Sequence, residues 1–248
     1  MVLSAGGPRP LSSSAPSRLS AAPARLRESV RARAARRLSS ALAPSSTDQV
    51  IDPRLTAQRV RRLAELDTAV FREVRDDAGQ TLAAALVVVG SLLLAALGGW
   101  LWLIVEVDGL STGRILAREV ALGLLCGAIL WGVWVMSTHL MLRYVFGRET
   151  TALSLVRTMG HAAFPAAGAA FMIVPALGFA VGMLSVLAWF ASSNAAIEAA
   201  APGATRREAL VANLAGFALF VVLMSVLADA AGIAPGFFVH AADLSVYV

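Results

Sequence analysis

Few side chains in this sequence could carry chemistry, and most of those lie near the ends of long apolar segments. Two histidines, two carboxylates and two amides share that position: His139, His161, Asn194, Glu198, Glu208 and Asn213. Histidines and carboxylates together can bind a metal ion or relay protons. Near a membrane surface, however, water hydrates polar side chains at little cost. We therefore expect a structural role for this inner-face polar cluster, with metal binding or proton transfer as the alternative.

Other catalytic signatures are scarce. All 21 basic residues are arginine, so the lysine of a phosphate-binding loop is missing, and the sequence contains no His-Glu-x-x-His zinc motif. The single cysteine, Cys126, cannot form an internal disulfide or a multi-cysteine metal site. We expect a protein that is not an enzyme, with no catalytic residues, no cofactor and no metal.

The elements that must position these side chains are membrane helices. Hydrophobic residues make up 58% of the chain, and they occur in long uncharged runs. The sequence predicts an all-α, polytopic membrane domain over residues 80–230. Its five expected transmembrane helices cover residues 81–105, 120–142, 158–174, 176–197 and 209–228.

The third and fourth spans come from one apolar stretch, residues 158–197. A single helix of that length would extend roughly 60 Å, twice the thickness of the hydrocarbon layer. We expect a helical hairpin that turns at Pro175, with a kink at Pro165 in its first arm. Small residues that allow close helix packing are predicted at Gly123, Gly127, Gly160, Gly178 and Gly182.

The region before the first span is strongly basic. Residues 1–50 are rich in Arg, Ser and Ala and are expected to be a disordered tail. Residues 51–79 are expected to form a cytoplasmic amphipathic helix, which lies on the membrane or packs on the ends of the spans. Residues 231–248 are expected to be a short extracytoplasmic tail without arginine.

The distribution of arginine predicts the orientation. With the N-terminus inside, 19 arginines lie on the cytoplasmic side and two outside, and this asymmetry agrees with the positive-inside rule. We expect a bacterial inner-membrane protein with its N-terminus in the cytoplasm and its C-terminus outside. An organelle membrane is the alternative, if the Arg- and Ser-rich start is a transit peptide.

Three stretches resemble the Yip domain family, five-span membrane proteins named for their interaction with Ypt/Rab GTPases, and in particular its bacterial-type members. They are "LDTAVFREVRDDAGQTLAAALVVV", "RTMGHAAFPAAGAAFMIVPALG" and "EAAAPGATRREALVANLAG". Gly160 and Pro165 keep the family pattern, whereas His161 stands where the family usually has tyrosine. The acidic Tyr-Gly-Pro stretch that precedes the membrane in many eukaryotic members is absent. The resemblance implies an α-helical membrane domain that organises membranes or binds partners and catalyses nothing.

The partners expected from the sequence are the lipid bilayer, anionic lipid at the basic N-terminal region, and a second copy or another membrane protein. Nucleic acid is not expected, because no aromatic residue lies among the arginines before Phe71. The leading hypothesis is a membrane-organising or partner-binding scaffold. The alternative is a small transporter or channel component that uses the inner-face polar residues.

Overall fold

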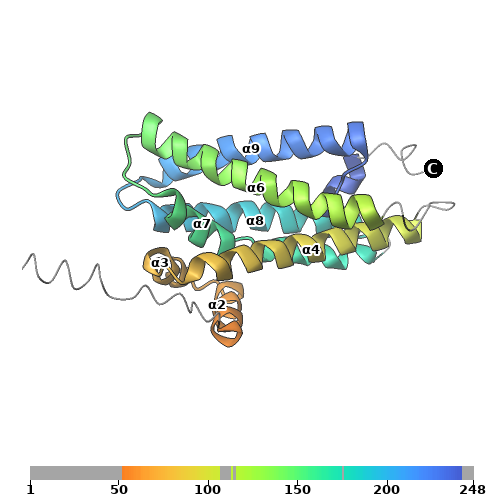
Figure 1. Ribbon diagram of the computed structural model, residues 1–248, viewed down its shortest axis with the longest axis horizontal. Coiled ribbons are helices and arrows are strands. Elements are labelled where there is room, and N and C mark those ends of the chain that lie inside the picture. The colour runs from red at the N-terminus through yellow and green to blue at the C-terminus, as the bar shows by residue number, and fades with distance from the viewer. Residues whose placement is uncertain (1–51, 107–112, 114–115, 175, 242–248) are drawn as a thin grey trace, which may run out of the picture. The chain divides into compact units, whose positions relative to one another are not determined.

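The computed structural model describes residues 52–106, 113, 116–174 and 176–241, and this part of the chain is helical without strands (Figure 1). The prediction of an all-α protein is confirmed. The predicted tail of residues 1–50 and the predicted turn at Pro175 lie outside the described residues. The α-helices are α2 (Pro53–Ala64), α3 (Ala69–Asp76), α4 (Gln80–Glu106), α6 (Gly123–Leu140), α7 (Ala152–His161), α8 (Gly178–Ala200) and α9 (Arg206–Ala231).

Four helical stretches in the described part of the chain are long and apolar enough to cross a membrane. They are Gln80–Glu106, Val120–Val145, Gly178–Ala200 and Arg206–Ala231, with mean hydropathies of 1.5 to 2.4. The second includes α6 and the π-helix η2 (Met141–Val145) that continues it, while the π-helix η1 (Leu116–Leu122) leads into α6. Large apolar side chains such as Ile129, Leu184 and Val222 point out of the protein. These four helices agree with a membrane protein by their length and composition, whereas five spans were predicted.

The segment predicted as the third span is not one α-helix. Helix α7 ends at His161, two residues form a turn, and the chain continues as the 3₁₀ helix η3 (Phe164–Ile173). Pro165 lies in the first turn of η3, where its fixed φ and missing N–H are tolerated. The expected kink is therefore a change of helix type. Helix α7 ends three residues after Thr158, whose hydroxyl donates a hydrogen bond to the backbone carbonyl of Ser154 in the preceding turn.

The predicted amphipathic helix is two helices. Asp52 caps α2 by accepting hydrogen bonds from the backbone N–H groups of Arg54 and Leu55, as an Asp-Pro start favours. The break falls at Leu66, which takes a left-handed conformation (φ 65°) at the position where glycine usually ends a helix. Leu63, Val70, Phe71 and Val74 turn inward, while the side chain of Leu66 is 85% exposed.

One arginine holds α2 onto α3. The two terminal nitrogens of Arg62 donate to the carboxylate of Glu73 (2.9 and 2.8 Å), and its Nε donates to Asp67 (2.9 Å). Arg62 therefore lowers the pKa of Asp67 and of Glu73. Both residues lie outside the apolar spans.

Acid is expected to loosen α2. A carboxylate with a depressed pKa stabilises the folded arrangement above its unfolded pKa, and this is lost as the pH falls through the folded value. Loosening should therefore begin below about pH 4, near the unfolded pKa of these groups. Below this pH, the distribution of distances between spin labels on α2 and α4 should broaden. Arg62→Gln should broaden it already at neutral pH, and unchanged distances in both conditions would contradict the role of Arg62.

The end of the described chain folds back against the long helices. After Gly232 (φ 60°) ends α9, the 3₁₀ helix η4 (Gly236–Ala241) contacts α4, α8 and α9. Phe238 and Val239 are buried there, and the ring of His240 lies 4.5 Å from that of Trp102. This part of the predicted extracytoplasmic tail is thus part of the packed structure.

Candidate functional site

The predicted polar cluster is not one network in the described structure: of its six residues, only Asn194 and Glu198 bond to each other. Asn194 donates to Glu198 one turn later (2.8 Å), and Glu208 is bonded to Arg148 and caps α9 with Thr205. Asn213 is fully buried; its amide joins the indole N–H of Trp134 (3.1 Å) to the carbonyl of Phe190 (3.0 Å). In the described part of the chain, no group of three or more His, Cys, Asp or Glu could hold a metal ion.

Both predicted histidines are buried. His161 Nδ1 lies 2.9 Å from the carbonyl of Arg157, one turn earlier in α7, so a neutral ring with its proton on Nδ1 satisfies that bond. The other nitrogen, Nε2, has no hydrogen-bond partner among the described residues, and the same is true of Nδ1 of His139. The transport alternative would have to use these free nitrogens.

The predicted small residues lie at close contacts. A Cβ on Gly160 would lie 2.7 Å from Cβ of Ala84, and one on Gly178 would lie 2.8 Å from the carbonyl oxygen of Met172. Gly123 and Gly182 are equally tight against Pro235 and Met172, whereas Gly127 has ordinary room beside Leu92. The two tightest glycines among the described residues, Gly98 and Gly216, were not predicted.

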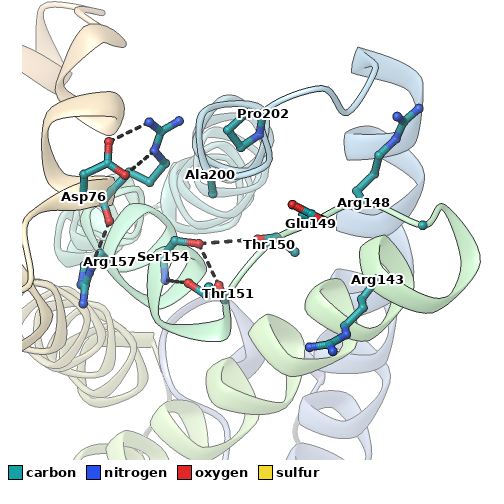
Figure 2. Close-up of a pocket in the computed structure, with 12 residues that line it drawn as sticks. Asp76, Arg143, Arg148, Glu149, Thr150, Thr151, Ser154, Arg157, Ala200 and Pro202 are labelled. Atoms are coloured by element: carbon teal, nitrogen blue, oxygen red, sulfur yellow. Dashed lines mark hydrogen bonds and ion pairs between the residues drawn. The ribbon is translucent and has the colours of Figure 1, made fainter. Parts of the chain in front are cut away.

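A polar pocket of about 750 Å³ lies where α3, η2, α7 and the end of α8 meet (Figure 2). Four arginines line it: Arg75, Arg143, Arg148 and Arg157. We call it the arginine pocket. Figure 2 shows Arg143 and Arg148 on one wall, with Asp76 and Arg157 on the other.

Two of these arginines are neutralised by carboxylates. Arg75 forms a two-bond pair with Asp76 (2.8 and 2.7 Å) and also donates to the carbonyl of Ala199. Arg148 forms a two-bond pair with Glu208 (3.0 and 2.8 Å), which ties the loop after η2 to the start of α9. The pairing lowers the pKa of Asp76 and raises that of Arg75 and Arg148.

The other two arginines have no carboxylate partner among the described residues. Arg157 is anchored by neutral groups: its Nε donates to Thr81 Oγ1 (2.9 Å) and its Nη1 to the carbonyl of Arg75 (3.0 Å). Arg143 is exposed, and its guanidinium lies 5.8 Å from the centre of the Tyr144 ring. These two guanidinium groups form no ion pair with a described residue, while Glu149, which also lines the pocket, adds one unpaired negative charge.

The sequence places these arginines on the cytoplasmic side but does not predict that they line one pocket. Arg143, Arg148 and Arg157 mark one basic loop, whereas Arg75 was assigned to the amphipathic helix. Only the packing of α3 against α7 and α8 brings Arg75 to the same pocket. The basic loop between two apolar runs was the available signal.

A second feature lies between α2 and α4. An apolar groove of about 490 Å³ is lined by Pro53, Thr56, Ala57, Val60, Arg61, Ala64 and Leu86. Leu86, which contributes the α4 side of this lining, is an exposed leucine. Figure 1 shows α2 running across the direction of α4. Such an arrangement is typical of a helix that lies in the plane of a membrane surface.

The sequence "GLSTG" at residues 109–113 matches the Gly-x-Ser-x-Gly pattern of hydrolases. In those enzymes the pattern joins a β-strand to a helix. Here it follows α4, and four of its five residues lie outside the described part of the chain. The pattern alone therefore gives no reason to assign a catalytic serine.

Comparison of the chain with models of protein families, with curated proteins and with solved structures gave no match.

Proposed function

We propose that this protein is a non-enzymatic, multi-pass membrane protein of Yip type that binds anionic lipid at its cytoplasmic face and organises the membrane or holds a partner there. The observation that carries the proposal is the pair α2 and α3. This pair is basic, apolar on one side, and joined to the first long helix, with α2 across its direction.

Contacts along the chain support five membrane segments. The ends of α6 and α8 are close together, because Arg143 and Pro202 line the same pocket. The start of α8 is at the other end, since a Cβ on Gly178 would touch the ring of Trp102 near the end of α4. These contacts are consistent with a chain that passes from the first end to the second between α6 and α8, with α8 leading back. This favours the predicted hairpin.

The broken third segment is long enough for this path. Ten residues of α-helix extend about 15 Å, and ten residues of 3₁₀ helix extend about 20 Å. End to end, α7 and η3 would extend about 35 Å, which is enough to cross the roughly 30 Å hydrocarbon layer. Gly168 and Met172 of η3 lie against Ser185 and Gly182 of α8, as an antiparallel pair of segments requires.

The orientation follows from charge. The arginine pocket and the basic α2–α3 pair lie toward the end that the positive-inside rule assigns to the cytoplasm. A bacterial inner membrane with its anionic lipids would attract these arginines, at about 1 kcal/mol each near the surface. The groove between α2 and α4 and the exposed Leu66 would take up acyl chains.

The proposal predicts that Leu66 enters anionic membranes. A fluorescent label at a cysteine replacing Leu66, with Cys126 replaced by serine, should be quenched by brominated phosphatidylglycerol in vesicles containing the full chain. Quenching should weaken in high salt, and it should be weaker when the brominated lipid is phosphatidylcholine. High salt screens the electrostatic attraction, and the neutral headgroup lacks it.

Arg54→Gln combined with Arg61→Gln should weaken the quenching, since both arginines are exposed on α2. The matched control, Arg206→Gln with Arg207→Gln, removes the same charge from the start of α9 and should leave it unchanged. Equal quenching in neutral lipid and high salt, or equal effects of the two double variants, would contradict lipid binding by α2.

A further inference from the structure

The arginine pocket has the features of a binding site that the lipid-surface role of α2 does not use. It is concave, it is built by four separate elements, and its wall is held by hydrogen bonds between them. Arg157 links α7 to α3 and α4, and Arg75 links α3 to α8. The pocket is therefore a constructed part of the fold rather than a gap between loops.

The fixed guanidinium of Arg157 retains donor capacity. Two of its nitrogens are bonded to Thr81 and to the backbone of Arg75, and Nη2 has no hydrogen-bond partner among the described residues. The exposed Arg143 on the facing wall adds a second guanidinium that no carboxylate engages there. A guanidinium binds phosphate oxygens with paired hydrogen bonds.

The start of α7 also lines the pocket. Thr151 caps this ten-residue helix by accepting from the N–H of Ser154 (3.1 Å), and both residues line the pocket. The positive end of the α7 helix dipole therefore lies at the pocket, where it favours an anion. The start of α7 would strengthen anion binding by the arginines, but it would not form a binding site without them.

We propose that the arginine pocket binds a phosphate group, carried either by a lipid headgroup or by a soluble phosphorylated molecule. Arg143 and Arg157, which form no ion pair with a described residue, suit a phosphomonoester or pyrophosphate, because these ligands offer several charged oxygen acceptors to guanidinium N–H groups whereas a carboxylate offers two. The volume of about 750 Å³ accommodates a headgroup-sized ligand.

One residue of the pocket opposes such a ligand. Glu149 lines it, is exposed, and has no ion-pair partner among the described residues. Its carboxylate repels phosphate, so its removal should strengthen binding. This opposite sign is useful because a gain of affinity cannot result from misfolding.

The test uses the full chain in a neutral detergent, with inorganic pyrophosphate as probe and chloride to hold ionic strength constant. Pyrophosphate should raise the midpoint of thermal unfolding. Arg143→Gln, which changes only an exposed side chain, should weaken the apparent affinity roughly tenfold, the value of one charge-assisted hydrogen bond. Glu149→Gln should strengthen it, and Arg206→Gln with Arg207→Gln should leave it unchanged.

A second arm uses nanodiscs that contain phosphatidic acid or only phosphatidylcholine. Binding of pyrophosphate alone would identify a soluble ligand, and stabilisation by phosphatidic acid that Arg143→Gln removes would identify a lipid. Failure of both probes, weaker binding by Glu149→Gln, or equal losses in the Arg206 and Arg207 control would overturn the proposal. None of these results would alter quenching of the label at Leu66, so the two proposals fail independently.

Discussion

Replacing Gly98 by alanine is expected to destabilise the protein by about 1–3 kcal/mol or more, the usual cost of forcing extra volume into a packed site. Gly98 lies in α4, and a Cβ there would overlap the backbone carbonyl of Ala169 in η3. Backbone cannot rotate away as a side chain can, so α4 and η3 would have to separate. Gly98→Leu should prevent folding altogether.

Gly90 provides the control in the same helix. A Cβ at Gly90 meets nothing within 4 Å, so Gly90→Ala should be neutral or should stabilise α4 by up to about 1 kcal/mol through helix propensity. The two variants can be compared by unfolding in detergent mixtures with increasing sodium dodecyl sulfate. Equal stabilities for Gly90→Ala and Gly98→Ala would show that α4 and η3 are not in backbone contact.

Truncating Trp134 is expected to cost about 3–5 kcal/mol, the range for removing a buried aromatic side chain. The ring of Trp134 is fully buried and lies 5.2 Å from Trp189, 5.1 Å from Phe217 and 5.6 Å from Phe220. Trp134→Ala would leave a cavity where α6, α8 and α9 meet. Met136→Ala, at a half-exposed position of α6, should have little effect.

The hydrogen bond from Trp134 to Asn213 can be separated from the packing. Trp134→Phe keeps an aromatic ring but removes the indole N–H, and Asn213→Leu removes the acceptor. Hydrogen bonds between membrane helices contribute about 0.6 kcal/mol on average, so each effect should be smaller than that of Trp134→Ala. A double-mutant cycle should give a coupling of that size, and purely additive changes would mean that the bond contributes nothing.

The long helices could be predicted from the sequence because uncharged runs of this length have few other solutions. The break at Leu66 could not, and the break before Pro165 was predicted as a kink rather than as a change to a 3₁₀ helix. At Leu66 the pattern of Leu63, Val70 and Val74 continues across the turn, and a leucine gives no sign of a left-handed backbone. At His161 the following residues are as apolar as before, so only the packing against α4 and α8 selects the 3₁₀ form.

In the candidate site, too, some features could be predicted from the sequence and others depend on tertiary packing. Counting arginines identified the charged loops, which are local in sequence. It could not reveal that Arg148 would be neutralised by Glu208, 60 residues later, or that Arg157 would bind the backbone of Arg75. The spacing of Gly123 and Gly127 likewise suggested close packing, whereas Gly98 and Gly216 belong to no visible repeat and make tighter contacts.

The close contacts of three glycines also constrain how this protein can diverge. Gly98 and Gly160 meet backbone or Cβ atoms on neighbouring elements, and Gly216 meets Trp134. Apolar residues on the lipid side can exchange freely, since any of them satisfies the bilayer. During divergence, the identities of the lipid-facing residues should therefore change long before these glycines do. Distant homologues of this chain would then be recognised by these three glycine positions rather than by overall sequence similarity.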